Sequence, residues 1–138
     1  MSTSGKAVAI SSGKRGVLVG GKAAVFDAET HRLVAPGVNV VVPQRCSAAH
    51  AEMLAIMLAQ RLRGTHDLAA PGQVPCELVT SAAPCAMCLG AVPWAGIRRL
   101  VCGAREEDVR ATGFDEGDKP AEWPRTLARR GIAVVEDV

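Results

Sequence analysis

Short hydrophobic runs separated by polar or glycine-containing turns predict a chain of alternating strands and helices. Apolar, β-branched runs of roughly four to eight residues are typical of strands. The 38–42 run is nearly all β-branched and is followed by Pro43, so it is expected to be a strand that ends there. Strands are expected at 23–26, 32–35, 38–42, 77–80, 100–102 and 132–135, with a further short one at 17–19.

Longer stretches rich in Ala, Leu, Met and Glu predict helices. The clearest covers residues 48–63, with Ser47 as its N-cap and Gly64 as its stop. Further helices are expected at 84–94, 106–110 and 122–130. Strands that alternate with helices in this way predict an α/β layered sheet.

The 138 residues suit one folded domain with its own core. Repeated Ser and Gly near the start are typical of a flexible segment. Residues 1–16 are therefore expected to form a flexible N-terminal segment, and residues 17–138 the folded domain.

Charge and composition exclude several classes of partner. Lys plus Arg number 16 and Asp plus Glu 14, so a net charge of +2 does not demand a polyanionic partner. Aromatic residues, on which single-stranded nucleic acid stacks, are 3% of the chain, which makes nucleic acid an unexpected partner. No apolar run is long enough for a membrane span or a secretion signal, so no membrane partner is expected and the cytoplasm is the expected location.

The cysteine count argues against a disulfide framework. Five is an odd number, and a chain without a secretion signal is expected to keep its thiols reduced. Buried free thiols or metal ligation explain these residues better: Cys46, Cys76, Cys85, Cys88 and Cys102.

Two local motifs carry candidate metal ligands. His50-Ala51-Glu52 lies near the start of one predicted helix, and Pro84-Cys85-Ala86-Met87-Cys88 at the start of the next. Sulfurs three residues apart share a helix face, and a helix N-terminus favours the thiolate form. One His and two Cys leave a tetrahedral zinc with a free position for water, which is typical of a catalytic site.

Two questions about this site stay open at the level of sequence. Glu52 lies about 200° around an ideal helix from His50, so both can reach one point only if the metal sits near the helix end. A structural zinc site is the alternative, and it needs a fourth ligand. The candidates for that ligand are Cys46, Cys76, His31 and His66.

Together, the motifs resemble the His-x-Glu and Pro-Cys-x-x-Cys signature of the zinc-dependent cytidine deaminase-like superfamily. The resemblance implies a three-layer α/β fold, in which helices flank a central mixed five-stranded sheet. It also implies one Zn²⁺ per chain, bound by His50, Cys85 and Cys88. Glu52 then takes a proton from water and passes it to the ring nitrogen and to the leaving amine.

The surrounding residues resemble one branch of this superfamily. The Cys-x-Met-Cys-x-Gly-Ala element is similar to guanine deaminases, fungal-type cytosine deaminases and tRNA adenosine deaminases. Leu89, Trp94 and the Gly113-Phe114-Asp115 element are similar to bacterial guanine deaminases.

This likeness implies substrate-binding roles for four residues. Asn39 hydrogen-bonds the ring edge, and the Ala51 N–H donates to a ring carbonyl. Trp94 forms a pocket wall, and Asp115 accepts from ring N–H groups. The alternatives are that Asn39 is a turn residue, Trp94 a core residue and Asp115 a loop cap.

The expected function is hydrolytic deamination of a free nucleobase, with guanine first and cytosine or an amino-triazine next. One alternative is a tRNA adenosine deaminase, which needs a basic, aromatic-lined approach surface. Another is a non-catalytic module stabilised by zinc. Because relatives are oligomers, a homodimer or a higher homo-oligomer is expected.

Overall fold

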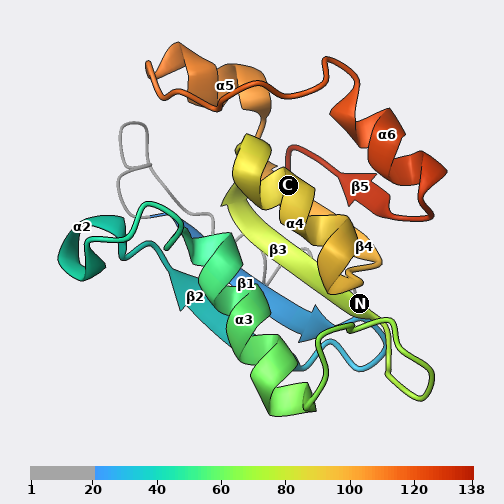
Figure 1. Ribbon diagram of the computed structural model, residues 1–138. Coiled ribbons are helices and arrows are strands. Elements are labelled where there is room, and N and C mark those ends of the chain that lie inside the picture. The colour runs from blue at the N-terminus through green and yellow to red at the C-terminus, as the bar shows by residue number, and fades with distance from the viewer. Residues whose placement is uncertain (1–20) are drawn as a thin grey trace.

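The computed structural model describes residues 21–138 and contains one mixed five-stranded sheet (Figure 1). Across the sheet the strands follow the order β2-β1-β3-β4-β5. They are β1 (Lys22–Asp27), β2 (Leu33–Val38), β3 (Cys76–Ala82), β4 (Arg99–Ala104) and β5 (Ala133–Val135). The expected segment 1–16, the strand at 17–19 and the domain boundary between residues 16 and 17 lie outside the described residues.

The strand directions confirm the mixed sheet. β1 pairs antiparallel with both β2 and β3, while β3 with β4 and β4 with β5 pair parallel. Parallel neighbours need a crossover, and helices supply it. The helices are α2 (Val41–Gln44), α3 (Ala51–Arg63), α4 (Ala86–Ala95), α5 (Glu106–Ala111) and α6 (Trp123–Arg129).

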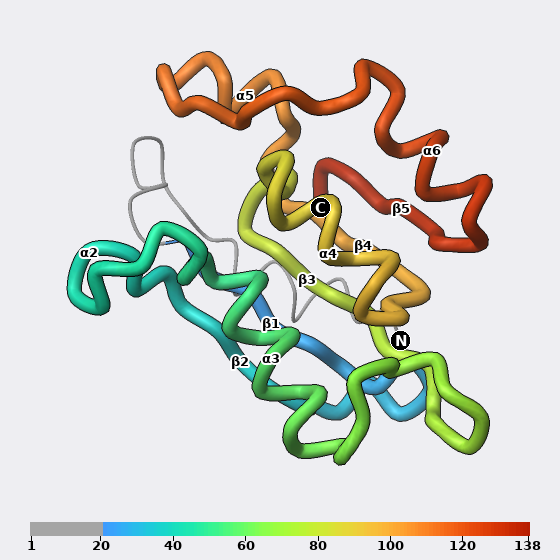
Figure 2. Tube along the Cα trace, viewed as in Figure 1, coloured from blue at the N-terminus to red at the C-terminus, as the bar shows by residue number. Residues whose placement is uncertain are grey.

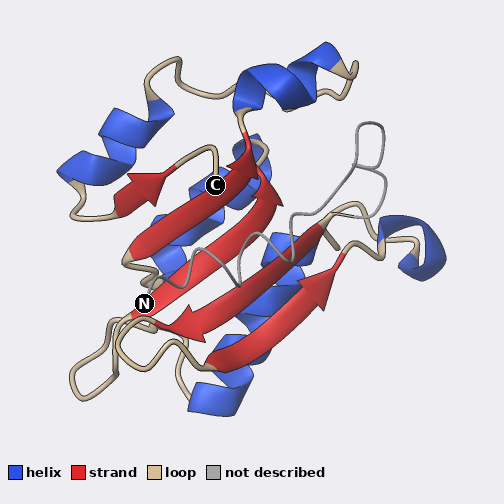
Figure 3. Ribbon diagram, turned by 180° about the vertical axis from the view of Figure 1, so that it is seen from behind, coloured by secondary structure: helices blue, strands red, loops and turns tan. Residues whose placement is uncertain are grey.

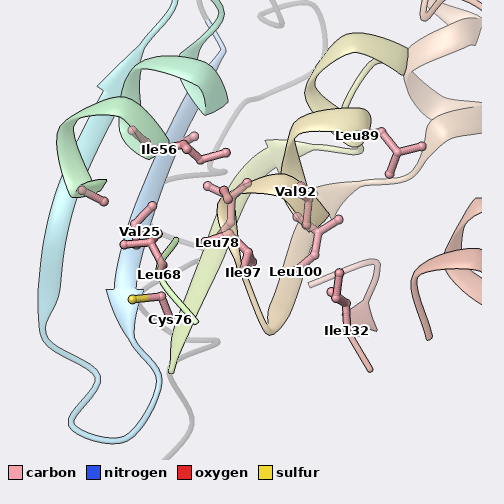
Figure 4. Close-up of a cluster of buried hydrophobic side chains, with 14 of the residues drawn as sticks. Val25, Ile56, Leu68, Cys76, Leu78, Leu89, Val92, Ile97, Leu100 and Ile132 are labelled. Atoms are coloured by element: carbon pink, nitrogen blue, oxygen red, sulfur yellow. The ribbon is translucent and has the colours of Figure 1, made fainter. Parts of the chain in front are cut away.

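Helices α3 and α4 lie on one face of the sheet, as the view from behind shows (Figure 3). The main core fills the space between them and the strands (Figure 4). Leu78 and Leu100 point into it from β3 and β4, Ile56 from α3 and Val92 from α4. This packing holds the two helices that carry the candidate ligands over the middle of the sheet. The opposite face carries a smaller buried cluster, made of Ala24, Phe26, Val79 and Val101.

The expected strand at 38–42 is wrong. β2 ends at Val38, and Val41–Gln44 form the short helix α2 instead. Asn39 starts this turn, because its Oδ1 accepts a hydrogen bond of 3.0 Å from the Val41 N–H. Val42 is 83% exposed. The preference of β-branched residues for strands depends on packing against a sheet, and this segment has left the sheet.

Both expected site helices begin later than predicted. α3 begins at Ala51, with His50 rather than Ser47 as its N-cap, and α4 begins at Ala86, with Cys85 as its N-cap. The expected stop at Gly64 is confirmed, since this residue adopts φ +66° and caps α3. One candidate metal ligand therefore stands at the N-cap of each helix.

Gly37 lets α3 lie directly on β2. A Cβ atom at this position would collide with the Ala51 carbonyl oxygen and lie 2.6 Å from the Ala55 nitrogen. Both atoms belong to the backbone of the first turns of α3, so they cannot rotate away. The absent side chain of Gly37 thus sets the height of the α3 N-terminus above the sheet.

Candidate functional site

The candidate site is a pocket lined by residues from the carboxyl end of β3 and from the beginnings of α3 and α4. The two helices begin near this end of the strand (Figure 1). In α/β folds, ligands bind at the carboxyl ends of the strands, where helix N-termini converge. The end of β3 contributes backbone and small side chains, and the two helices contribute the chemistry. The lining residues are Gly21, Asn39, His50, Ala51, Glu52, Ser81, Ala82, Ala83, Cys85, Val109, Phe114 and Glu116.

Three side chains in this region fit a zinc ion. His50 Nδ1 lies 3.5 Å from Cys85 Sγ and 3.6 Å from Cys88 Sγ. A tetrahedral zinc, with Zn–S bonds of about 2.3 Å and a Zn–N bond of about 2.0 Å, separates a nitrogen from a sulfur ligand by about 3.5 Å. The donors therefore stand at the spacing that a shared zinc requires.

Within residues 21–138, the structure brings no fourth protein ligand to these three. No further His, Cys, Asp or Glu of this part of the chain joins the group whose ligand atoms lie within 4.8 Å of one another. Cys46 is exposed, and Cys76 is buried in the main core. A site with three protein ligands keeps one coordination position for water, so the arrangement favours a catalytic site over a structural one.

The N-cap position of His50 explains how it shares a pocket with Glu52. His50 has extended backbone angles (φ −71°, ψ 155°), so the angular spacing of an ideal helix does not apply between the two residues. Glu52 lies in the first turn of α3 and lines the same pocket. His50 and Glu52 can therefore face one metal site, although residues two apart on an ideal helix point in nearly opposite directions.

The surroundings shift the pKa values of the two thiols in opposite directions. A hydrogen bond from the Cys88 side chain, supported by backbone N–H groups of the first turn of α4, lowers the pKa of Cys85 to about 5. The same hydrogen bond, together with burial, raises the pKa of Cys88. Cys85 is thus a ready thiolate ligand at a helix N-terminus.

Glu52 has the environment of a proton carrier. Its side chain is half-buried, and burial raises the pKa of its carboxyl above the usual range, while a hydrogen bond with Cys88 opposes this shift. A carboxyl whose pKa is shifted towards neutrality both takes and gives a proton readily.

Two of the four expected substrate-binding residues line the pocket. Asn39 is there, and its Oδ1 is engaged by the Val41 N–H, which leaves its amide nitrogen as a donor. The turn role and the pocket position of Asn39 therefore coexist. Ala51 lines the pocket as the first residue of α3, where an N–H has no partner inside the helix.

The structure does not bring Trp94 and Asp115 to the pocket. Trp94 is 87% exposed, so it is neither a wall of this pocket nor a core residue, and it borders a separate hollow between α4 and α6. Asp115 is exposed, and its Oδ1 accepts a hydrogen bond of 2.8 Å from the Gly117 N–H. That contact is the loop-capping role considered as its alternative.

Glu116 is a pocket carboxylate that the sequence analysis missed. It lines the pocket and is only 3% exposed. Burial raises its pKa, and a hydrogen bond from Lys119 opposes the shift. Two adjacent acids, Asp115 and Glu116, signalled a carboxylate in this loop, but the fold of the loop decides which one turns inward.

Comparison with known proteins places deaminases among the relatives of this chain. The family described as "Cytidine and deoxycytidylate deaminase zinc-binding region" matches residues 6–104. Guanine deaminase of Bacillus subtilis (strain 168) is 33% identical over 124 residues, which cover 86% of this chain and 76% of that protein.

Two solved structures are similar over most of the described chain. Guanine deaminase from Nitrosomonas europaea is 56% identical with a TM-score of 0.83, covering 85% of this chain and 64% of that one. The structure of a mutant of the protein NE0047 in complex with 8-azaguanine has the same identity, coverage and TM-score. The chain thus spans less than two thirds of the length of these solved relatives. No helix within residues 21–138 is long and apolar enough to cross a membrane.

Proposed function

Because the chain belongs to the cytidine and deoxycytidylate deaminase family, we propose that it hydrolyses an amino group from a free nucleobase, with guanine as the first candidate. The observation that carries this proposal is the spacing of His50, Cys85 and Cys88, with Glu52 in the same pocket. Guanine is favoured because the relatives named above are guanine deaminases and one solved relative holds 8-azaguanine.

The polar groups of the pocket suit a purine of this kind. The Ala51 N–H is a donor for a ring carbonyl, and the Asn39 amide nitrogen is a donor for a ring nitrogen. Glu116, in place of Asp115, is the acceptor for a ring N–H. A purine with acceptors on one edge and N–H groups on another would find hydrogen-bond donors in Ala51 and Asn39 and an acceptor in Glu116.

A zinc ion held by His50, Cys85 and Cys88 supplies a Lewis acid that lowers the pKa of water. Glu52 accepts a proton from the attacking water and delivers it to the ring nitrogen. The ring carbon gains a C–O bond and loses its C–N bond. Glu52 then takes the second proton from the newly attached hydroxyl group, which becomes the ring carbonyl, and passes it to the departing amine, which leaves as ammonia.

The substrate is tested by incubating the zinc-loaded protein with free bases, nucleosides and a tRNA anticodon stem, followed by mass spectrometry. We expect conversion of guanine to xanthine with release of ammonia. Turnover of nucleosides but not of free bases would overturn this choice, and turnover of the tRNA stem alone would establish the editing alternative. A zinc-loaded protein inert on every substrate would favour the non-catalytic module.

We also propose a homodimer or a higher homo-oligomer that forms through α3 and α4. Both helices carry exposed apolar side chains, namely Met57 and Leu62 on α3 and Met87 and Trp94 on α4. Such side chains are typical of surfaces that a partner covers.

Light scattering is expected to give a dimer or larger mass for the chain and a reduced mass for Trp94→Glu. Val42→Glu, at an equally exposed apolar residue on α2, is the control and should leave the mass unchanged. A monomeric wild type contradicts the proposal. The cytoplasmic location stays a prediction.

A further inference from the structure

Lys119 is a buried cation for which the proposed chemistry gives no role. Its side chain is fully buried, with 0% exposed. Its Nζ donates to the Pro84 carbonyl oxygen at 2.7 Å and to Glu116 Oε2 at 3.2 Å. It belongs to the segment that joins α5 to α6, whose course can be followed in Figure 2.

This segment holds both chain neighbours of Cys85. Lys119 binds the carbonyl of Pro84, the residue before Cys85. The Glu116 carbonyl accepts a hydrogen bond of 2.8 Å from the N–H of Ala86, the residue after it. Cys85 is therefore fixed on either side by one short loop.

The helix itself provides only part of this support. The Leu89 N–H donates to the Cys85 carbonyl oxygen at 2.9 Å, but α4 begins at Ala86, so its first N–H groups have no partner inside the helix, and Pro84 has no N–H at all. The Pro84 carbonyl and the Ala86 N–H are therefore the backbone groups of this turn that depend on the loop between α5 and α6. Outer residues that orient metal ligands in this way affect metal affinity strongly.

The burial of Lys119 is compensated from several elements. Glu106 Oε2 lies 3.7 Å from Nζ, and the Trp123 ring centroid lies 5.0 Å from it. Trp123 Nε1 in turn donates to Glu106 Oε2 at 2.9 Å, which joins α6 to α5. A buried ammonium is costly unless it is paired and hydrogen-bonded, so this arrangement holds Lys119 at one place.

We propose that Lys119 is a positioning residue that fixes the Pro84–Cys85 turn, and with it the geometry of the metal site, and that it also orients the Glu116 carboxylate. The inference rests on the proposed zinc site. On this proposal, the loop between α5 and α6 supports the metal site through Lys119. Residues 113–120 of this loop are not themselves among the three ligands.

The test measures metal binding rather than activity. Lys119→Met removes the donors but keeps much of the apolar volume. We expect its zinc affinity, measured by competition with a chromophoric chelator, to fall by about 10–100-fold. The absorption spectrum of the cobalt-substituted protein is expected to change because the Cys85 sulfur moves.

Lys119→Arg keeps a cationic donor and should bind zinc more tightly than Lys119→Met. Arg125→Met removes an exposed cation from α6 that pairs with Glu122, and it should match the wild type in both measurements. Wild-type zinc affinity and cobalt spectrum in Lys119→Met overturn the proposal, whether or not its melting temperature falls.

If Lys119→Met alone does not fold, the same measurements are made on the double variant Glu116→Gln/Lys119→Met. This double variant also removes the negative charge of Glu116, which would be buried without its partner. The single variant Glu116→Gln is then the reference. A double variant that binds zinc as tightly as this single variant overturns the proposal. Failure of the wild type to bind zinc would instead remove the proposed metal site itself, so the two failures are distinguishable.

Discussion

Replacing Glu52 with glutamine is expected to lower kcat for base deamination by about 10²–10⁴-fold, which is the usual contribution of a general acid–base group. Glutamine has nearly the same shape but cannot take up a proton at neutral pH. It is not one of the three ligands, so zinc content should stay at one ion per chain. Steady-state release of ammonia and metal analysis of the purified variant check both expectations.

Glu29→Gln is the matched control, because Glu29 is an exposed acid in the turn between β1 and β2. It should leave kcat, KM and zinc content unchanged. A Glu52→Gln variant with wild-type kcat would remove Glu52 from the proton pathway. A variant without zinc would show that Glu52 supports the metal rather than the chemistry.

Replacing Gly37 with alanine is expected to destabilise the fold by about 3 kcal/mol, at the upper end of the usual cost of overpacking. The new methyl group would overlap the Ala51 carbonyl oxygen and crowd the Ala55 nitrogen, both backbone atoms of α3. Relief requires α3 to move away from β2. Because His50 caps this helix, the displacement should also weaken zinc binding. Urea unfolding and chelator competition measure the two effects.

Gly90→Ala is the control for this variant. Apart from the backbone of its own helix and its chain neighbours, no described atom lies within 4 Å of a Cβ atom at Gly90, which lies inside α4. Alanine in a helix interior is favoured over glycine by about 1 kcal/mol, so this variant should be as stable as the wild type or more so. Equal stability of Gly37→Ala and the wild type would mean that α3 does not depend on this close approach.

The metal ligands were predictable because their information is local. His50 and the cysteine pair are recognised by residue type and short spacing, and a helix N-terminus is itself a local feature. The strand at 38–42 was mispredicted because local preference does not say where the sheet ends. Asn39 redirects the chain through one side-chain hydrogen bond, and the valines after it have no sheet to pack against.

The substrate side of the pocket was less predictable for a different reason. Asp115 and Glu116 are adjacent acids, and only the path of the loop turns the second one inward. Lys119 depends on contacts with Pro84, which is 35 residues away in the chain. Trp94 lies on the outer surface of α4, and no local pattern distinguished that face from the inner one.

Pro36 has a consequence for how this chain can assemble. β2 is an edge strand, and Pro36 lies opposite Ala24 on β1. The Asn39 N–H donates to the Gly21 oxygen, so hydrogen-bonded pairs fall at every second position and Pro36 is not among them. Its ring nitrogen therefore faces the open edge, where an N–H would otherwise receive an incoming strand. A second copy cannot extend the sheet past β2 without losing that bond, which disfavours edge-to-edge aggregation through β2.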